Sequence, residues 1–199
     1  GVRIGGARPS RTSLRQARQA SGFRLLKLDE EKGTAQLLEA TSGIEEGGFG
    51  KGYALDRAAD LLQRAGVRSG LLDFGGQLLA FGTPRRVSLA GPQDRQRPRL
   101  SFTLDQASLS TSGTSEKGRH ILDPRTGQPA RAWGSVGVIG ATGLEADCLS
   151  TALFVMGPVQ GLRWAARHQV PACFLLNNGQ IRMSPAFRAL APHFPKESS

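Results

Sequence analysis

The chain has 199 residues, of which 39% are hydrophobic, and this supports one domain with a sizeable core and excludes a disordered chain. Its net charge of +10 would suit nucleic acid, anionic lipid or phosphorylated small molecules, but the arginines are dispersed and no RNP, zinc-finger or helix-turn-helix signature occurs. Because no apolar run has the length of a membrane span either, we expect neither a nucleic-acid partner nor a transmembrane segment in this chain.

The N-terminal part of the chain combines a basic segment with a predicted hairpin. Residues 1–22 contain five arginines and no acidic residue, and Ser10 is placed to cap a short helix. The segments 23–28 and 34–38 flank a turn rich in charged residues, which is typical of a β-hairpin. The chain begins at Gly1 rather than Met, so we expect processing or an upstream segment.

A glycine-rich stretch, Gly47-Gly-Phe-Gly-Lys-Gly-Tyr-Ala-Leu-Asp56, leads into the clearest helical pattern, residues 54–65. Its glycines allow a sharp turn and a close approach to a ligand, and the helix N-terminus beside Lys51 suits a phosphate. It is not a Walker P-loop, because Glu45 and Gly52 stand where that motif requires Gly and Ser or Thr. A turn that only caps the helix is the alternative. The charged residues expected to face water on this helix are Asp56, Arg57, Asp60 and Arg64.

The middle of the chain has the pattern of several short strands. A Gly75-Gly76 pair separates two of them and lets a flat ligand or another backbone come close. Residues 83–98 are expected to form an exposed connection, 108–113 a hydroxyl-rich turn, and 119–129 the end of a strand followed by a Pro/Gly turn. The predicted strands are 67–74, 78–81, 100–104, 135–139, and the pair 173–176 and 180–183 around Asn177-Asn-Gly179.

Two helices are predicted over 144–155 and 158–166, and the first carries Asp147 and Thr151 one turn apart on a mostly apolar helix. An unpaired buried carboxylate is costly, so a hard cation with oxygen ligands would satisfy it, and its removal without metal should cost folding little. A bond to a neighbouring backbone amide is the alternative. Cys148 and Cys173 form no metal-binding spacing, and we expect both to be buried small residues.

His120 is the histidine of interest among three, since it precedes a turn with Asp123 and Arg125. Imidazole readily takes up a proton near neutral pH, so His120 could act as a general base. A lone histidine more often has a structural role, and the residues alone leave both interpretations open.

Taken together, five stretches resemble, in order, the motifs of the FAD:protein FMN transferases, the ApbE family, between about residues 10 and 184. The resemblance implies a magnesium-dependent enzyme that cuts FAD at its pyrophosphate and joins FMN through a phosphoester to a threonine of a target flavoprotein. It also implies that this chain is N-terminally short, since family members carry a segment with no counterpart here. The stretches are Gly47-Gly-Phe-Gly-Lys-Gly-Tyr-Ala-Leu-Asp-Arg-Ala-Ala, Asp73-Phe-Gly-Gly, Thr111-Ser-Gly, His120-Ile-Leu-Asp-Pro-Arg-Thr-Gly-Gln-Pro and Ala146-Asp-Cys-Leu-Ser-Thr-Ala-Leu.

The resemblance also assigns roles to single residues. Asp147 and Thr151 would hold Mg²⁺ through their side chains, and His120 would be the base that activates the acceptor threonine. The residues that would contribute backbone carbonyls to Mg²⁺ are Gly50 and Ser150, and those that would line the FAD site are Gly48, Lys51, Gly75, Gly76, Ser112 and His120.

We therefore expect an α+β fold of the ApbE type, related to the T-fold, with mixed or antiparallel sheets and flanking helices. The domain would cover residues 23–184, with 1–22 as a basic part of it and 185–199 as a tail. Alternatives to FMN transfer are a FAD pyrophosphatase, a catalytically weak flavin-binding or scaffold relative, and, outside the family, a basic nucleic-acid-binding module. Family resemblance favours a periplasmic or membrane-associated location and leaves the cytoplasm open.

Overall fold

The structure is a computed structural model that describes residues 9–94, 96–113 and 120–190. The chain forms two compact units, one from residues 1–45 and 122–129 and a larger one from residues 46–121 and 130–199. These units differ from the expected division at residues 22 and 184. No helix in the described ranges combines the length and the apolar character that crossing a membrane requires.

The smaller unit contains the predicted N-terminal helix and hairpin. Ser10 caps the helix by accepting a hydrogen bond from the Ser13 N–H at 3.0 Å, and the hairpin pairs antiparallel with Leu26 opposite Leu37, so both predictions are confirmed. A second, shorter hairpin encloses a turn in which the Arg125 guanidinium lowers the pKa of the Asp123 carboxyl. The elements are α1 (Arg11–Gln19), η1 (Phe23–Leu25), β1 (Leu26–Asp29), β2 (Thr34–Leu37), β8 (Leu122–Asp123) and β9 (Gln128–Pro129).

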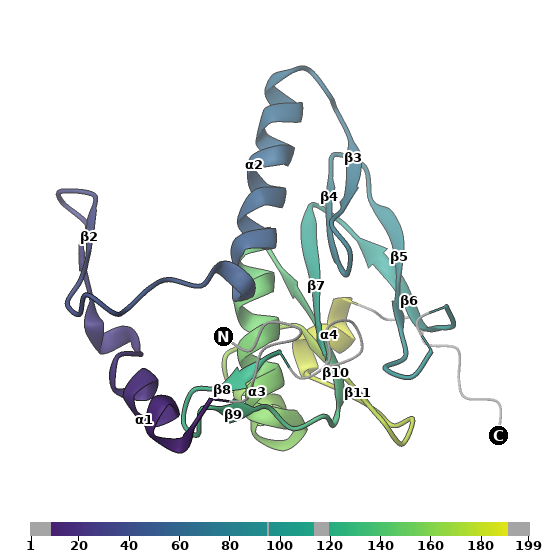
Figure 1. Ribbon diagram of the computed structural model, residues 1–199. Helices are drawn as coiled ribbons and strands as arrows, with labels where there is room; N and C mark the ends of the chain where they lie inside the picture. The colour runs from purple at the N-terminus through teal and green to yellow at the C-terminus, as the bar shows by residue number, and fades with distance from the viewer. Residues whose placement is uncertain (1–8, 95, 114–119, 191–199) are drawn as a thin grey trace. The chain divides into compact units, whose positions relative to one another are not determined.

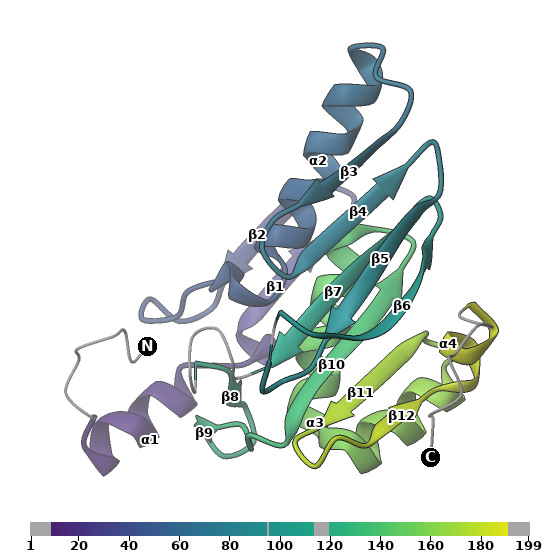
Figure 2. The same ribbon diagram turned by 90° about the vertical axis from the view of Figure 1, so that its right-hand side faces the viewer.

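The larger unit is built around a six-stranded sheet in which every pair of neighbours is antiparallel (Figure 2). The strand order is β12-β11-β10-β7-β4-β3, so β7 and β10 are central. The strands are β3 (Gly70–Asp73), β4 (Gln77–Phe81), β7 (Ala107–Gly113), β10 (Gly134–Gly140), β11 (Ala172–Leu176) and β12 (Ile181–Met183).

Helices cover one face of this sheet and a separate hairpin covers the other (Figure 1). The helical side is formed by α2 (Gly50–Arg64), which η2 (Glu46–Gly48) precedes, and α3 (Gly143–Arg167). Alternation along β10 sends Val136 and Val138 into the core shared with α3, as expected for a period of two. The other face packs against β5 (Arg85–Ala90) and β6 (Pro98–Leu104). The α+β fold class is thus confirmed.

Two segments predicted as loops are strands. Residues 108–113 belong to β7, which pairs with β4 on one side and β10 on the other. This hydroxyl-rich segment is therefore a paired strand of the sheet and not a turn. Residues 85–90 form β5, whose Val87 and Leu89 are buried while neighbouring side chains are exposed. The Arg and Pro content of 83–98 concealed this alternation.

One helix prediction is confirmed and one segment expected as a tail is partly helical. The predicted helices 144–155 and 158–166 both occur within α3, where Gly157, with a φ of +77° and a ψ of 172°, breaks the helix between them. Within the expected tail, α4 (Pro185–Leu190) buries Phe187 completely, with its ring edge-on to Phe102 at 5.3 Å between centroids. Residues 185–190 therefore belong to the core of the larger unit, and the rest of the expected tail, 191–199, lies outside the described residues.

Candidate functional site

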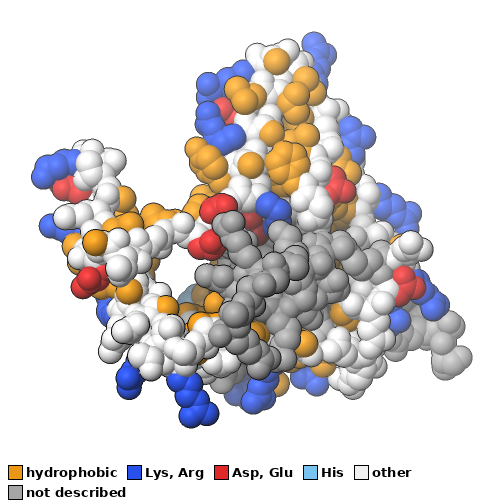
Figure 3. All heavy atoms as spheres, in the orientation of Figure 1, with side chains coloured by type: hydrophobic (Ala, Val, Ile, Leu, Met, Phe, Trp, Pro, Cys, Tyr) orange, Lys and Arg blue, Asp and Glu red, His pale blue; other side chains and the backbone are white. Residues whose placement is uncertain are grey.

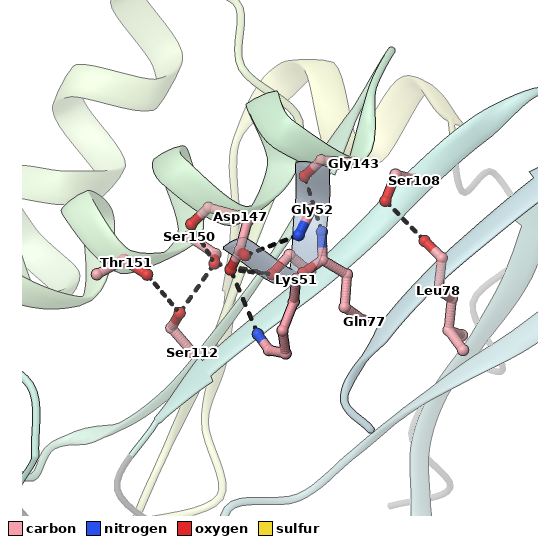
Figure 4. Close-up of polar contacts among 11 residues, drawn as sticks. Lys51, Gly52, Gln77, Leu78, Ser108, Ser112, Gly143, Asp147, Ser150 and Thr151 are labelled. Carbon is pink, nitrogen blue, oxygen red and sulfur yellow. Dashed lines mark hydrogen bonds and ion pairs between the residues drawn. The ribbon is translucent and has the colours of Figure 1, made fainter. Parts of the chain in front are cut away.

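Two glycines allow α2 and α3 to cross at their N-terminal turns. A Cβ added to Gly52 would lie 2.1 Å from the Gly143 carbonyl oxygen, and one added to Gly143 would lie 2.5 Å from the Gly52 carbonyl oxygen. Both distances are below any real contact, so only glycine permits this approach. The crossing places the first turn of α2, including Lys51, against Asp147 of α3 (Figure 4).

The Asp147 carboxylate lies at the centre of this crossing and is 1% exposed. One oxygen, Oδ2, accepts a hydrogen bond from the Gly52 N–H at 3.0 Å. The other, Oδ1, has only longer contacts, 3.4 Å to Lys51 Nζ and 3.5 Å to Ser110 Oγ. The bond to a backbone amide that the sequence left as an alternative is therefore present, and the carboxylate is not unpaired.

A chain of hydroxyl groups continues from Asp147 between α3 and strand β7. Ser150 Oγ lies 3.1 Å from Ser110 Oγ and 2.8 Å from Ser112 Oγ. Ser112 Oγ in turn lies 3.3 Å from Thr151 Oγ1. The serines of β7 and the hydroxyls of α3 thus form one network, and the structure brings together five of the predicted site residues, Lys51, Asp147, Ser150, Thr151 and Ser112.

The predicted glycines lie at the border of the same network. A Cβ on Gly48 would be 3.5 Å from Thr151 Cγ2, which puts η2 against that threonine. Gly50 begins α2 itself, so the helix starts within the glycine-rich stretch rather than after it. Gly75 and Gly76 both have left-handed φ values, +62° and +80°, and the Gly76 carbonyl accepts from the Thr111 N–H of β7.

Sequence reasoning missed the buried Gln77 at the start of β4. Its Nε2 donates to the Gly143 carbonyl oxygen at 2.7 Å, and its Oε1 has no hydrogen-bond partner among the described residues. Gln77 faces Ser110 of β7 in the sheet register, so it fixes the N-terminus of α3 over the hydroxyl network. A single polar residue directly after Gly-Gly in an otherwise apolar strand was the available signal.

Asp56 and Cys148 differ from their predictions. Asp56 does not simply face water: Oδ1 accepts from the Gly143 N–H at 2.6 Å and Oδ2 from the Leu144 N–H at 2.9 Å. Cys148 is exposed rather than buried, because it follows Asp147 on α3 and turns away from the sheet. Cys173 is buried as predicted, and desolvation raises its pKa to about 12.

His120 is exposed and follows residues 114–119, which lie outside the described residues. The next residue, Ile121, packs against the core formed by α3 and β10. The assignment of His120 as a base remains a prediction.

The donor set at Asp147 fits Mg²⁺. One carboxylate oxygen without a short contact lies beside serine and threonine hydroxyls, and Mg²⁺ prefers hard oxygen ligands, often one or two carboxylates together with substrate phosphate oxygens. No group of three or more His, Cys, Asp or Glu that could hold a metal occurs within the described ranges. Asp147 and Thr151 are the side chains that would hold the ion.

The fold and the site together define a class: an α+β protein whose antiparallel sheet carries, under two crossing helices, an oxygen-only site next to a lysine. Such a site suits a phosphorylated ligand with a hard cation. The comparisons with known proteins agree with this description. The chain belongs to the ApbE family, whose sequence pattern matches residues 2–174.

Curated relatives are FAD:protein FMN transferases. The chain is 28% identical over 200 residues to the enzyme of Klebsiella pneumoniae (strain 342), a match that covers 90% of this chain and 57% of that one. It is 30% identical over 158 residues to the enzyme of Escherichia coli (strain K12), which covers 70% of this chain and 45% of that one. The chain thus spans about half the length of the curated relatives it matches.

Solved structures give the same result. The apo form of the Pseudomonas stutzeri flavinyl transferase ApbE superposes with a TM-score of 0.80 at 32% identity, covering 94% of this chain and 62% of that one. The ApbE protein of Thermotoga maritima superposes with a TM-score of 0.81 at 28% identity, covering 93% of this chain and 65% of that one. The predicted family and fold are confirmed.

Proposed function

We propose that this chain carries the catalytic site of a FAD:protein FMN transferase, which moves FMN from FAD to a threonine of a target flavoprotein in a Mg²⁺-dependent reaction. The observation that carries the proposal is the position of Asp147: it is buried between Lys51 and the hydroxyls of β7 and α3, in a chain whose curated relatives bear this activity.

Lys51 and the start of α2 would bind the FAD pyrophosphate. The first backbone bond within α2 runs from the Tyr53 N–H to the Phe49 carbonyl, so the preceding amides of Gly50 and Lys51 have no partner inside the helix. These amides, the positive end of the helix and the half-exposed Lys51 ammonium favour a phosphate at this point.

The metal would be held by the side chains of Asp147 and Thr151, with Gly50 and Ser150 as carbonyl donors. When bound, Mg²⁺ would neutralise the negative charge that develops on the phosphate as the pyrophosphate is cleaved. The Ser112–Ser150 hydrogen bond, 2.8 Å, holds strand β7 against α3 and thereby fixes the direction of the Thr151 hydroxyl.

His120 would take the proton from the acceptor threonine. A new bond forms between the threonine oxygen and the phosphorus of FMN, the bond from that phosphorus to the bridging oxygen breaks, and AMP leaves with the electron pair. A threonine hydroxyl is a weak nucleophile at neutral pH and needs such a base.

The test is incubation of the chain with FAD and a flavoprotein or peptide that carries an acceptor threonine, with Mg²⁺ or with EDTA. We expect FMN-linked product and AMP only with Mg²⁺, and none with a Thr→Val acceptor. If free FMN and AMP form in equal amounts whether or not the acceptor is present, the chain hydrolyses FAD and does not transfer FMN. A wild-type chain that binds neither FAD nor Mg²⁺ would overturn the proposal.

The proposal includes the partners and place of action. The partner is a flavoprotein, and a periplasmic or membrane-associated location follows from the family resemblance alone. Nucleic acid is not proposed as a partner, since Lys and Arg lie scattered among other side chains on the face seen in Figure 3.

A further inference from the structure

The two crossing helices carry the same short pattern at their N-termini. Gly52-Tyr-Ala-Leu-Asp56 on α2 and Gly143-Leu-Glu-Ala-Asp147 on α3 both read Gly-x-x-x-Asp. The glycines form the contact between the backbones, and each aspartate lies one turn further along its helix. Each carboxylate therefore reaches the N-terminal turn of the other helix.

The two carboxylates differ in the number of backbone amides that they bind on the other helix. Asp56 uses both oxygens for α3, one on the Gly143 N–H at 2.6 Å and one on the Leu144 N–H at 2.9 Å. Asp147 uses only Oδ2 for α2, on the Gly52 N–H. Asp147 Oδ1 makes only the longer contacts to Lys51 Nζ and Ser110 Oγ, so this oxygen is the one with room for a further partner.

We propose that Asp56 is the positioning residue of the cation site: it holds the N-terminus of α3 on α2, so that Asp147 and Thr151 face the first turn of α2 and one oxygen of Asp147 stays available to a divalent cation. Asp56 itself is not a ligand. This inference rests on the proposed function, because it assigns Asp56 a role toward the cation of that same site.

An asparagine at position 56 is the sharpest perturbation. It keeps the shape of the side chain and one acceptor oxygen, but its amide group cannot accept from the second N–H of α3. Asp60→Asn is the matched control: the same substitution, one turn later on α2, at a carboxylate that bonds to the Arg64 Nε at 2.9 Å rather than to α3.

The experiment titrates each protein with Mn²⁺ alone, following free Mn²⁺ by electron paramagnetic resonance at a temperature where all proteins are folded by circular dichroism. We expect Asp56→Asn to weaken Mn²⁺ affinity by about tenfold or more, as loss of a residue that orients a metal ligand does. Asp60→Asn should stay within about twofold, as a surface change does. A residue that only stabilises the fold would shift the melting temperature and leave Mn²⁺ affinity unchanged.

A second measurement uses the wild-type chain and covers the case in which Asp56→Asn does not fold. Coupling is reciprocal, so a cation at Asp147 must strengthen the contacts that hold α3. Saturating Mg²⁺ should slow hydrogen exchange at the Gly143 and Leu144 amides more than at Ala165 and Ala166, near the far end of the same helix.

The outcomes separate the two proposals. Wild-type Mn²⁺ affinity in a folded Asp56→Asn protein, or unchanged exchange at Gly143 and Leu144 in Mg²⁺, would overturn the role of Asp56 and leave the proposed function intact. A wild-type chain that binds no Mn²⁺ would remove the cation site itself, and the role of Asp56 with it.

Discussion

Replacing Asp147 by asparagine or by alanine should separate the folding role of this residue from its role toward the cation. The sequence alone suggested that an unpaired carboxylate could be removed at little cost. The structure predicts otherwise for alanine, because the buried Gly52 N–H would lose its acceptor. Asparagine retains an oxygen at that position, so it should keep this hydrogen bond.

The expected magnitudes follow from these contacts. A buried N–H left without an acceptor costs about 1–3 kcal/mol. The ion pair with Lys51 adds at most about 1 kcal/mol, since the Lys51 side chain is 43% exposed and its charge is screened by solvent. We therefore expect the free energy of unfolding to fall by about 1–4 kcal/mol in Asp147→Ala and by about 1 kcal/mol or less in Asp147→Asn.

The assay is urea unfolding followed by circular dichroism, together with transfer measured against Mg²⁺ concentration. Both variants should lose Mg²⁺-dependent transfer, because each lacks the carboxylate, while alanine should lose more stability than asparagine. Mg²⁺-dependent transfer in a folded Asp147→Asn protein would refute the metal assignment. An alanine variant as stable as wild type would show that the Gly52 hydrogen bond contributes nothing.

Three further results are expected. His120→Ala should leave FAD affinity within a few-fold and slow single-turnover transfer by about 10²-fold or more, whereas Lys51→Ala should first weaken FAD binding in a fluorescence titration; unchanged transfer would remove His120 from the mechanism. Native protein should react with a thiol reagent only at Cys148, and slowly near neutral pH, since burial and the Asp147 charge raise its pKa; Cys173, with a pKa of about 12, should react only on unfolding. Gel shifts at physiological salt should show no binding to single-stranded or duplex DNA, and micromolar affinity there would restore the nucleic-acid alternative.

The sequence predicted those parts of the fold whose signals are local. Apolar periodicity located α2 and α3, and the Asn177-Asn-Gly179 turn located the β11–β12 pair. Within the site, the spacing of Asp147 and Thr151 on one mostly apolar helix suggested either a cation or a hydrogen bond to a backbone amide, and the structure contains that hydrogen bond. These features needed no knowledge of which elements become neighbours.

The parts that were missed depend on long-range contacts. Asp56 and Gly143 are 87 residues apart in sequence, and nothing near Asp56 distinguishes it from Asp60 until α3 is placed beside it. The serines of β7 looked like a turn because their hydroxyls find partners on elements distant in sequence, Leu78 of β4 for Ser108 and Ser150 of α3 for the other two. When the burial of a residue depends on a partner distant in sequence, its own segment does not predict whether it lies in a strand or in a turn.

The charges at the helix crossing nearly cancel, which supports the proposal that this site binds an anionic substrate together with a cation. Each helix N-terminus contributes roughly half a positive charge and Lys51 one more, while Asp56 and Asp147 contribute two negative charges, so the protein groups alone come close to balance. Both carboxylates are needed to bring the two positive helix ends together, since each satisfies amides of the other helix. A site balanced in this way has little excess attraction for a pyrophosphate by itself. Under the proposed function, a divalent cation at Asp147 would add about two positive charges, so binding of the anionic pyrophosphate would depend on the metal.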